Sequence, residues 1–564
     1  MIWRGARAQT AHPEYEFKPH ERATMPGSPA NPEHPARRRA AYVAIGILIG
    51  ITGGLGNALV SVNLVFAQGT LGLDPDQSAL LTAAYLMTNT TANLLLVKYR
   101  QQFGLQPFIR YMLPIYAATT VLHLLVHGFW SSIAVRAASG FAASALSTLT
   151  LLYVMQGMPA AKRLTGIMLG ISIPQLATPL ARAISPGLLV SGDWHMLYWC
   201  ELGLTLASLA AVMSLPLPPS ERVKAFEKGD FLTVALLAPG LWILIAVLTE
   251  GRIEWWTERA WIGWGLVAST VLISTALVFE HHRENPLIHT RWLGTREMAR
   301  LILVAIAVRV LLSEQAFGSV GLLTALGMIN DQMVTLNLVI VVASIAGIAT
   351  AVLTFDPADP SRALSLAVLL IALGAFMDAN ATNLSRPTSF MLSQALIGFA
   401  SLLFLAHTMV IGLSRTLLAG PKHFVSFVVL FGLSQSLGGL AGSALLGTFQ
   451  VVREKIHSHE LVQSLVLTDP VIAARVRGGG ASVSGVIGDP ALSNAEGAAL
   501  LARTVAREAN ILAYNDVFWL IGVLAILTFI WSLSIRESIR RRGEISPVIA
   551  LQQRAAAATT AAET

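Results

Sequence analysis

The sequence predicts an all-α integral membrane protein with fourteen transmembrane helices. Only 13% of its 564 residues are charged and 54% are hydrophobic, whereas soluble domains carry roughly 25% charged residues. The mean hydropathy of +0.62 agrees with this reading. The apolar residues gather into fourteen runs, and a helix needs about 20 such residues to cross ~30 Å of hydrocarbon.

The apolar runs fall into three groups that polar stretches separate. The first group has six runs, the second has two and the third has six, so we expect a 6+2+6 order of spans. The runs are 41–67, 77–97, 108–128, 130–155, 163–190, 194–216, 231–250, 260–280, 299–326, 332–354, 362–379, 387–414, 422–449 and 515–536.

This grouping divides the chain into two helical bundles, a linker and two tails. The tails are polar, and the first is rich in proline, arginine, histidine and glutamate, so we expect both to be disordered. The regions are a cytoplasmic tail (1–40), an N-terminal six-helix bundle (41–216), a two-helix linker with cytoplasmic loops (217–298), a C-terminal six-helix bundle (299–536) and a second cytoplasmic tail (537–564).

A long polar segment, 451–514, interrupts the second bundle before its last span. It is too long for a plain turn and contains an Ala-rich stretch, 491–513, that is typical of a helix. We expect a periplasmic loop that either docks a partner or is simply a tolerated insertion.

The placement of lysine and arginine predicts the orientation, because short cytoplasmic loops are enriched in these residues. An even number of spans then puts both termini in the cytoplasm and segment 451–514 outside. We expect a multi-pass protein of the bacterial inner membrane. The basic residues that would share the cytoplasmic side include Arg37, Arg38, Arg39, Lys98, Arg100, Lys162, Arg163, Arg222, Lys224, Arg283, Arg291, Arg415, Lys422, Arg536 and Arg540.

Some function classes are disfavoured by what the sequence lacks. A single cysteine, Cys200, excludes an intrachain disulfide and a thiolate zinc cluster. The chain has no phosphate-binding G-x-x-x-x-G-K-[ST] loop, no H-E-x-x-H and no nucleophile–base arrangement, so we expect no enzyme, cofactor or metal. The net charge is +7, and the basic residues lie beside the apolar runs, where they can contact anionic lipid. We therefore expect no nucleic-acid partner.

Four short motifs follow the order of a known transporter family. They are Leu-Thr-Ala-Ala-Tyr-Leu at 81–86, Arg-Ala-Ala-Ser-Gly at 136–140, Gly-Leu-Ser-Gln-Ser-Leu-Gly-Gly at 432–439 and Ala-Tyr-Asn-Asp-Val-Phe at 513–518. With the 6+2+6 order, the chain resembles the fourteen-span drug–proton antiporters of the major facilitator superfamily, the EmrB/QacA-like exporters. The resemblance implies a major facilitator fold with 14 transmembrane helices. It also implies a periplasmic membrane-fusion adaptor and an outer-membrane channel as partners.

The sequence departs from that family in its first span, in a cytoplasmic loop and in its fifth span, where the glycine and proline motif is weakened to Gly166, Gly170, Pro174 and Pro179. The family carries an acidic residue in its first span, whereas the matching stretch 55–63 has none. The cytoplasmic loop at 93–104 lacks the family's aspartate and has fewer arginines. The gating-loop candidates in that segment are Lys98, Arg100 and Gly104.

Charged side chains inside spans carry the main functional signal. A charge at mid-bilayer costs ~2.5–3.5 kcal/mol on insertion scales, so it usually faces a cavity or a partner. Glu314 and Glu201 are the proton-coupling candidates. Glu314 lies in the counterpart of the first span and would replace the missing acid. Asp378, at an outer helix end, is expected to be solvated. The substrate-cavity candidates are Arg136, Arg182, Arg309, Asn57, Asn63, Tyr85 and Gln435.

These observations together predict a secondary exporter of small amphipathic or aromatic compounds, as in multidrug efflux. It would work as a proton-coupled antiporter by alternating access. Its partners would be the substrate and protons, bound in a cavity between the bundles, and the surrounding lipid bilayer. An organic-acid uptake symporter on the same fold and a membrane sensor that does not transport are the alternatives. For each charged residue inside a span, the alternative to a functional role is a structural ion pair that holds helices together.

Overall fold

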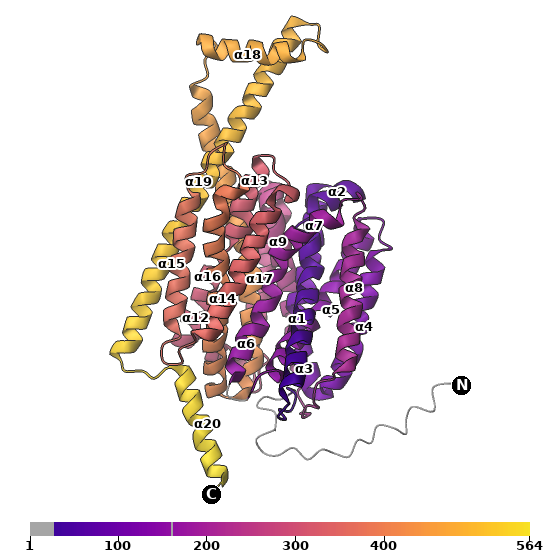
Figure 1. Cartoon of the computed structure of the whole chain (residues 1–564), viewed down its shortest axis with the longest axis vertical. Coiled ribbons are helices and arrows are strands. Elements are labelled where there is room, and N and C mark those ends of the chain that lie inside the picture. Colours follow the sequence, from indigo (N-terminus) through magenta and orange to yellow (C-terminus); the bar gives the residue numbers. More distant parts are fainter. Residues whose placement is uncertain (1–26, 160–161, 564) are drawn as a thin grey trace, which may run out of the picture.

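The computed structural model describes residues 27–159 and 162–563, and these residues are almost entirely helical (Figure 1). Among them, thirteen helices are long and apolar enough to cross a membrane. The predicted run 108–128 corresponds to a nineteen-residue helix, Leu105–His123, that is not one of the thirteen. The all-helical membrane fold is thus confirmed. The count of fourteen spans stays a prediction, for which this helix would be the additional span.

The N-terminal bundle contains the first six predicted spans. Aromatic and aliphatic side chains, such as Tyr42, Phe108 and Tyr153, form its core. A Cβ added to Gly140 would lie 2.2 Å from the carbonyl oxygen of Tyr85, so glycine lets two helices approach closely there. The helices are α1 Ala36–Ser61, α2 Leu64–Leu71, α3 Pro75–Phe103, α4 Leu105–His123, α5 Phe129–Gln156, α6 Arg163–Ser172, α7 Ala177–Leu188 and α8 His195–Ser214.

The C-terminal bundle repeats this pattern with a larger apolar core. Its first span is interrupted by a π-helical segment, Glu314–Ser319, which divides α12 from α13. Such segments occur often at functional sites. The helices are α12 Arg296–Leu311, α13 Val320–Ala325, α14 Val334–Leu353, α15 Ser361–Asp378, α16 Met391–Ala419, α17 Phe424–Gln463 and α19 Pro490–Arg541.

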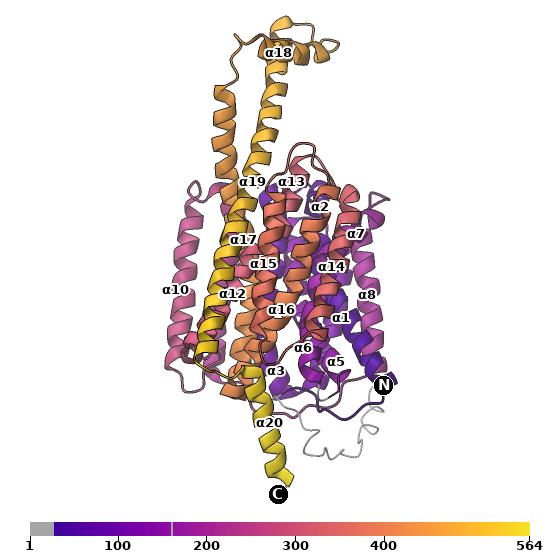
Figure 2. The ribbon, with the colours of Figure 1, turned by 60° about the vertical axis from the view of Figure 1, so that its left-hand side comes forward.

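The two linker helices lie to one side of the bundles. Helix α9, Lys228–Glu250, packs against α3 and α17, and therefore contacts both bundles. Helix α10, Ala260–His282, packs mainly on α9, and only 17% of its most apolar window is buried (Figure 2). The exposed apolar face of α10 is one that lipid would cover.

Segment 451–514 is a helical projection rather than an irregular loop (Figures 1 and 2). Helix α17 is 40 residues long in all and α19 is 52, and both extend beyond the bundle. Helix α18, Pro470–Val483, lies between them in the sequence and packs on α19. At ~1.5 Å per residue a 52-residue helix is about 78 Å long, far more than a bilayer core requires. We call residues 451–514 the projection, and the side of the bundle that carries it the projection end.

The tails differ from the expected disorder wherever the structure describes them. Residues 1–26 lie outside the described residues. The Ala30 amide donates to the Pro219 carbonyl at 3.0 Å, and α1 begins at Ala36 rather than near 41. Disorder was the wrong expectation at the C-terminus, where α20, Pro547–Glu563, packs on α16 and fully buries Val548. Proline at the first helical position, followed by many alanines, favours this helix.

Candidate functional site

A cavity of about 120 Å³ lies between the two bundles. The N-terminal bundle lines it with residues around α7, and the C-terminal bundle lines it from α12, α14, α16 and α17. Apolar contacts between α6 and α16, through Ile167 and Met168, close the bundles together at the end opposite the projection. The cavity is therefore central, where alternating access requires a binding site.

Two arginines are the charged groups of this cavity. Arg182 comes from α7 and Arg309 from α12, and no acidic residue belongs to the described lining. The Arg309 Nε donates to the Gln435 carbonyl at 2.9 Å. Glycines 438 and 439 leave room for the Arg309 side chain, since a Cβ at Gly439 would lie 3.1 Å from its guanidinium. The remaining polar lining residues are Gln175, Thr178, Gln315, Asn337, Ser344, Ser401 and Gln435.

A pair of buried carboxylates lies behind the cavity wall. Glu314 opens the π-helical segment and is 0% exposed, and Asp378 at the end of α15 is 3% exposed. The Gln394 amide nitrogen donates to both Glu314 oxygens at 3.0 and 3.1 Å, and to Asp378 Oδ2 at 2.8 Å. We call Glu314 and Asp378 the acid pair. Within the described residues, no basic side chain forms an ion pair with either.

A hydrogen-bonded path joins the acid pair to the cavity. Gln315 lines the cavity, and its amide nitrogen donates to the carbonyl and side-chain oxygens of Gln394 at 3.3 and 3.4 Å. Gln394 in turn holds both carboxylates. A change in cavity contents can therefore reach the acid pair through two amide side chains.

The N-terminal bundle contains a second buried polar cluster around Gly56. Arg136 is 1% exposed and donates to the Gly56 carbonyl at 3.0 Å and to Asn57 Oδ1 at 2.6 Å. Its guanidinium also lies 4.6 Å from the centre of the Tyr85 ring. These contacts give a buried cation several partners on α1 and α3.

Glu201 belongs to the same cluster through Tyr116. The Tyr116 hydroxyl donates to Glu201 Oε1 at 2.7 Å, while Oε2 has no hydrogen-bond partner in the described residues. A Cβ at Gly56 would lie 2.1 Å from the Tyr116 hydroxyl and 2.6 Å from Glu201 Oε1. Glycine at this position thus lets the carboxylate approach α1. We call Arg136, Asn57, Tyr85, Tyr116 and Glu201 the arginine cluster.

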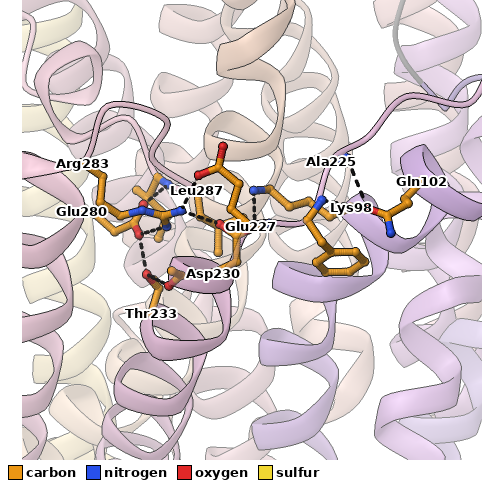
Figure 3. Close-up of polar contacts among 12 residues, drawn as sticks. Lys98, Gln102, Ala225, Glu227, Asp230, Thr233, Glu280, Arg283 and Leu287 are labelled. Carbon is orange, nitrogen blue, oxygen red and sulfur yellow. Dashed lines mark hydrogen bonds and ion pairs between the residues drawn. The ribbon is translucent and has the colours of Figure 1, made fainter.

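An ion network ties the linker to the N-terminal bundle at the end opposite the projection (Figure 3). Lys98 Nζ on α3 lies 2.5 Å from Asp230 Oδ2 on α9. Arg283 bridges Asp230 at 3.1 Å and Glu280 at 2.6 Å, and Thr233 donates to Glu280. Asp230 and Glu280 are almost fully buried, so the network compensates their charges within the protein.

The predicted proton-coupling and substrate-cavity residues fall into four separate places. Arg182, Arg309 and Gln435 line the cavity. Arg136, Asn57, Tyr85 and Glu201 do not line it and form the arginine cluster instead. Glu314 lies in the acid pair, and Asn63 hydrogen-bonds between α1 and α7.

The gating-loop candidates occupy the end opposite the projection. Lys98 joins the ion network, and Arg100 is 4% exposed with no hydrogen-bond partner for Nε in the described residues. Gly104 has φ +88° between α3 and α4, a left-handed conformation that glycine adopts without strain. The tight turn between these helices requires this residue.

Sequence reasoning missed several residues of the site. The expectation that Asp378 is solvated is wrong, because Gln394 and Ser393 of α16 cover it at the helix end. Gln315 and Gln394 were not singled out, since uncharged amides in apolar runs give a weak signal. The position of Gln315 directly after Glu314 is the signal in the sequence that could have identified it as a site residue.

Comparison with known proteins identifies relatives of the fold. The sequence profile described as "Major Facilitator Superfamily" matches residues 46–444. Among curated protein sequences, none matches the chain. The human organic anion transporter MFSD10 (TETRAN) has a similar structure, with TM-score 0.52 and 15% identity over 87% of this chain and 100% of that one.

Two peptide transporters are similar in structure as well. Tetrameric PepTSo2 has TM-score 0.55 and 14% identity, covering 89% of this chain and 99% of that one. The peptide transporter POT in complex with sulfate has TM-score 0.53 and 14% identity, covering 89% and 95%. At these identities the likeness shows the fold alone.

Proposed function

Because the chain belongs to the Major Facilitator Superfamily, we propose that it is a secondary transporter of small amphipathic organic anions that is coupled to protons. The cavity carries this proposal. Two guanidinium groups, Arg182 and Arg309, face it with no carboxylate in the described lining. Arginine forks bind carboxylate, sulfonate or phosphate groups through charge-assisted hydrogen bonds. The apolar lining residues, including Leu312, Phe404 and Leu405, suit an aliphatic or aromatic body.

Binding of a defined anion to the purified protein tests this substrate class. We expect 1-naphthoate to bind, and Arg182→Gln or Arg309→Gln to raise its Kd by roughly tenfold or more, since hydrogen bonds to charged groups contribute ~1.5–3 kcal/mol. Arg475→Gln, at an exposed position on α18, removes the same charge far from the cavity and serves as the control. Equal Kd values for all four proteins would exclude the cavity arginines as the anion site.

Proton coupling is assigned in this proposal to the acid pair. Two buried carboxylates that share one amide donor, with no cation paired to them among the described residues, are well suited to hold a proton between them. Gln394 connects them to the cavity wall. In Gln394→Leu this connection is lost while the cavity arginines remain, so we expect anion exchange to persist and pH-driven transport to fall. Loss of both activities together would contradict a relay role.

The direction we propose is export by antiport across the bacterial inner membrane, with both termini in the cytoplasm. An inside-negative potential drives an anion outward and a proton inward, at about 2.3 kcal/mol per charge per 100 mV. The human neighbour of the same fold is described as an organic anion transporter, so the fold accommodates such cargo. We propose no enzymatic activity.

Proton–anion symport is the second candidate, and the path from cavity to acid pair favours it. Protonation of the pair removes negative charge near a bound anion, so proton and anion can stabilise each other. Flux in proteoliposomes separates the two mechanisms. An imposed inward-directed proton gradient drives the anion out of the vesicle by antiport and into it by symport.

The projection is proposed to dock a periplasmic adaptor that continues the path toward an outer-membrane channel. Apolar side chains at its tip are exposed, including Val462 (55%), Leu467 (70%) and Val471 (60%). Exposed apolar patches on soluble segments mark interaction sites. Replacing residues 464–489 by a short loop should spare transport by purified protein and reduce export from intact cells. Unchanged export from cells would argue against an adaptor.

A further inference from the structure

One asparagine bridges the two bundles at the projection end of the cavity. Asn330 begins the short helical turn that leads into α14 of the C-terminal bundle. Its side-chain nitrogen donates to the carbonyl oxygen of Val62 at 3.1 Å and to Asn63 Oδ1 at 3.1 Å. Both acceptors lie where α1 of the N-terminal bundle ends. These bonds must break before the bundles can separate at this end.

Asn63 is fixed so that its oxygen faces this bridge. Its side-chain nitrogen donates to the Leu59 carbonyl at 2.8 Å and to Ser185 Oγ at 2.7 Å. Asn63 is 6% exposed and Ser185 is 0% exposed. With both amide hydrogens used on α1 and α7, the oxygen is left to accept from Asn330, which makes the bridge preorganised.

Arg182 connects the bridge to the cavity. It lies three residues before Ser185 on α7 and lines the cavity. Its Nη1 donates to Asn330 Oδ1 at 3.5 Å, a long bond to a neutral acceptor. An anion in the cavity offers the same guanidinium an acceptor that is itself charged, and bonds between an N⁺–H donor and an O⁻ acceptor are shorter, at ~2.7–2.9 Å. The anion therefore competes favourably with Asn330 for Arg182.

We propose that Asn330 is the latch of the projection-end gate and that Arg182 releases it when an anion enters the cavity. The response to anions rests on the proposed function, whereas the latch itself does not. Arg182 then both selects the anion and couples its binding to opening. An empty cavity stays closed toward the projection because Arg182 and Asn63 hold Asn330 from two sides.

Accessibility of a cysteine introduced into the cavity tests the latch. Thr178 lines the cavity and is exposed to it, so Thr178→Cys in a Cys200→Ser background can be labelled in intact cells with a membrane-impermeant maleimide. Ser482→Cys, exposed on the projection, establishes which side the reagent reaches. We expect Asn330→Ala to raise the labelling rate of the introduced cavity thiol by at least roughly threefold to tenfold, which is the effect of losing one hydrogen bond, because the variant loses the bonds to both Val62 and Asn63. Gln332→Ala, on the same turn but without a bond to α1, is the matched control.

The outcomes separate the latch from the substrate class. Equal labelling of Asn330→Ala and Gln332→Ala overturns the latch. With 1-naphthoate present, labelling of the cavity thiol in the protein with an intact latch should rise toward the Asn330→Ala rate, and Arg182→Gln should abolish this response. If 1-naphthoate binds but leaves that labelling unchanged, the role of Arg182 is overturned. If no anion binds and Asn330→Ala still opens the gate, the proposed substrate class fails and the latch stands.

Discussion

The two bundles bury acidic side chains in opposite electrostatic settings. In the arginine cluster, Glu201 shares its surroundings with Arg136, whose guanidinium hydrogen-bonds to α1 and lies against the Tyr85 ring. In the acid pair, Glu314 faces a second carboxylate and a neutral amide. A buried acid with a nearby cation can stay ionised, whereas two acids without one cannot both do so cheaply. From this difference we propose a structural role for the first cluster and a proton-carrying role for the second.

Removing the cation of the arginine cluster should have the largest effect on stability. Arg136→Met leaves Asn57 and the Gly56 carbonyl without their donor and leaves Glu201 without a nearby cation. We expect the free energy of unfolding to fall by about 3–5 kcal/mol, which is the cost of leaving a buried charge uncompensated. Thermal unfolding in detergent measures the change. A variant as stable as wild type would show that the cluster does not hold the bundle together.

A steric change at Gly56 probes the same cluster without altering charge. Gly56→Ala places a Cβ 2.1 Å from the Tyr116 hydroxyl, so we expect a loss of about 1–3 kcal/mol from overpacking. Gly432→Ala on α17 is the control, because nothing lies within 4 Å of its added Cβ. That control should be neutral or slightly stabilising in the same unfolding assay. Equal behaviour of both variants would argue against close packing at Gly56.

The ion network of Figure 3 offers an intermediate case, because its charges have more than one partner. Lys98→Met removes one cation from Asp230, while Arg283 still contacts it at 3.1 Å. We expect a loss of about 1–2 kcal/mol, less than for a fully broken buried pair. Thermal unfolding of Lys98→Met, alone and combined with Arg283→Gln, checks this redundancy. If Lys98→Met costs as much as Arg136→Met, Arg283 does not compensate.

The acid pair should show the smallest effect on stability and a large one on transport. Asp378→Asn removes a buried negative charge but retains a group of the same shape beside Gln394. We expect the free energy of unfolding to change by less than about 1 kcal/mol or to rise, since a repulsion is relieved. Proton-coupled flux in proteoliposomes should fall at least tenfold. Destabilisation comparable to Arg136→Met would contradict the contrast between the two clusters.

The sequence predicts the fold well and the site in part. Apolar runs of the right length lead directly to the helices, and a charge in an apolar run identifies Glu314, Arg182 and Arg309, because lipid tolerates such groups only against a cavity or partner. The burial of Asp378 could not be predicted in this way, because it depends on α16 packing over a helix end. Gln394 could not be identified either, because an uncharged amide in an apolar run costs little free energy and so gives no clear signal. Which charge meets which partner depends on packing between helices far apart in the sequence.

The helical projection and α20 show the same limit at the level of whole segments. Their polar composition resembles that of linkers, yet continuous helix-forming sequence without internal proline extends α17 and α19 beyond the bundle. Hydropathy reports the solvent of a segment rather than its conformation. Of the projection, helix propensity predicts only the Ala-rich stretch 491–513.

Substrate-driven proton movement in inverted membrane vesicles tests the central claim most directly, with wild type, Glu314→Gln and Glu201→Gln compared for 1-naphthoate and a panel of aromatic anions and cationic drugs. We predict that an anion moves protons with wild type and with Glu201→Gln, and that Glu314→Gln abolishes this movement while still binding the anion. Proton movement that survives Glu314→Gln and is lost in a folded, anion-binding Glu201→Gln protein would reverse the roles of the two clusters and contradict the account.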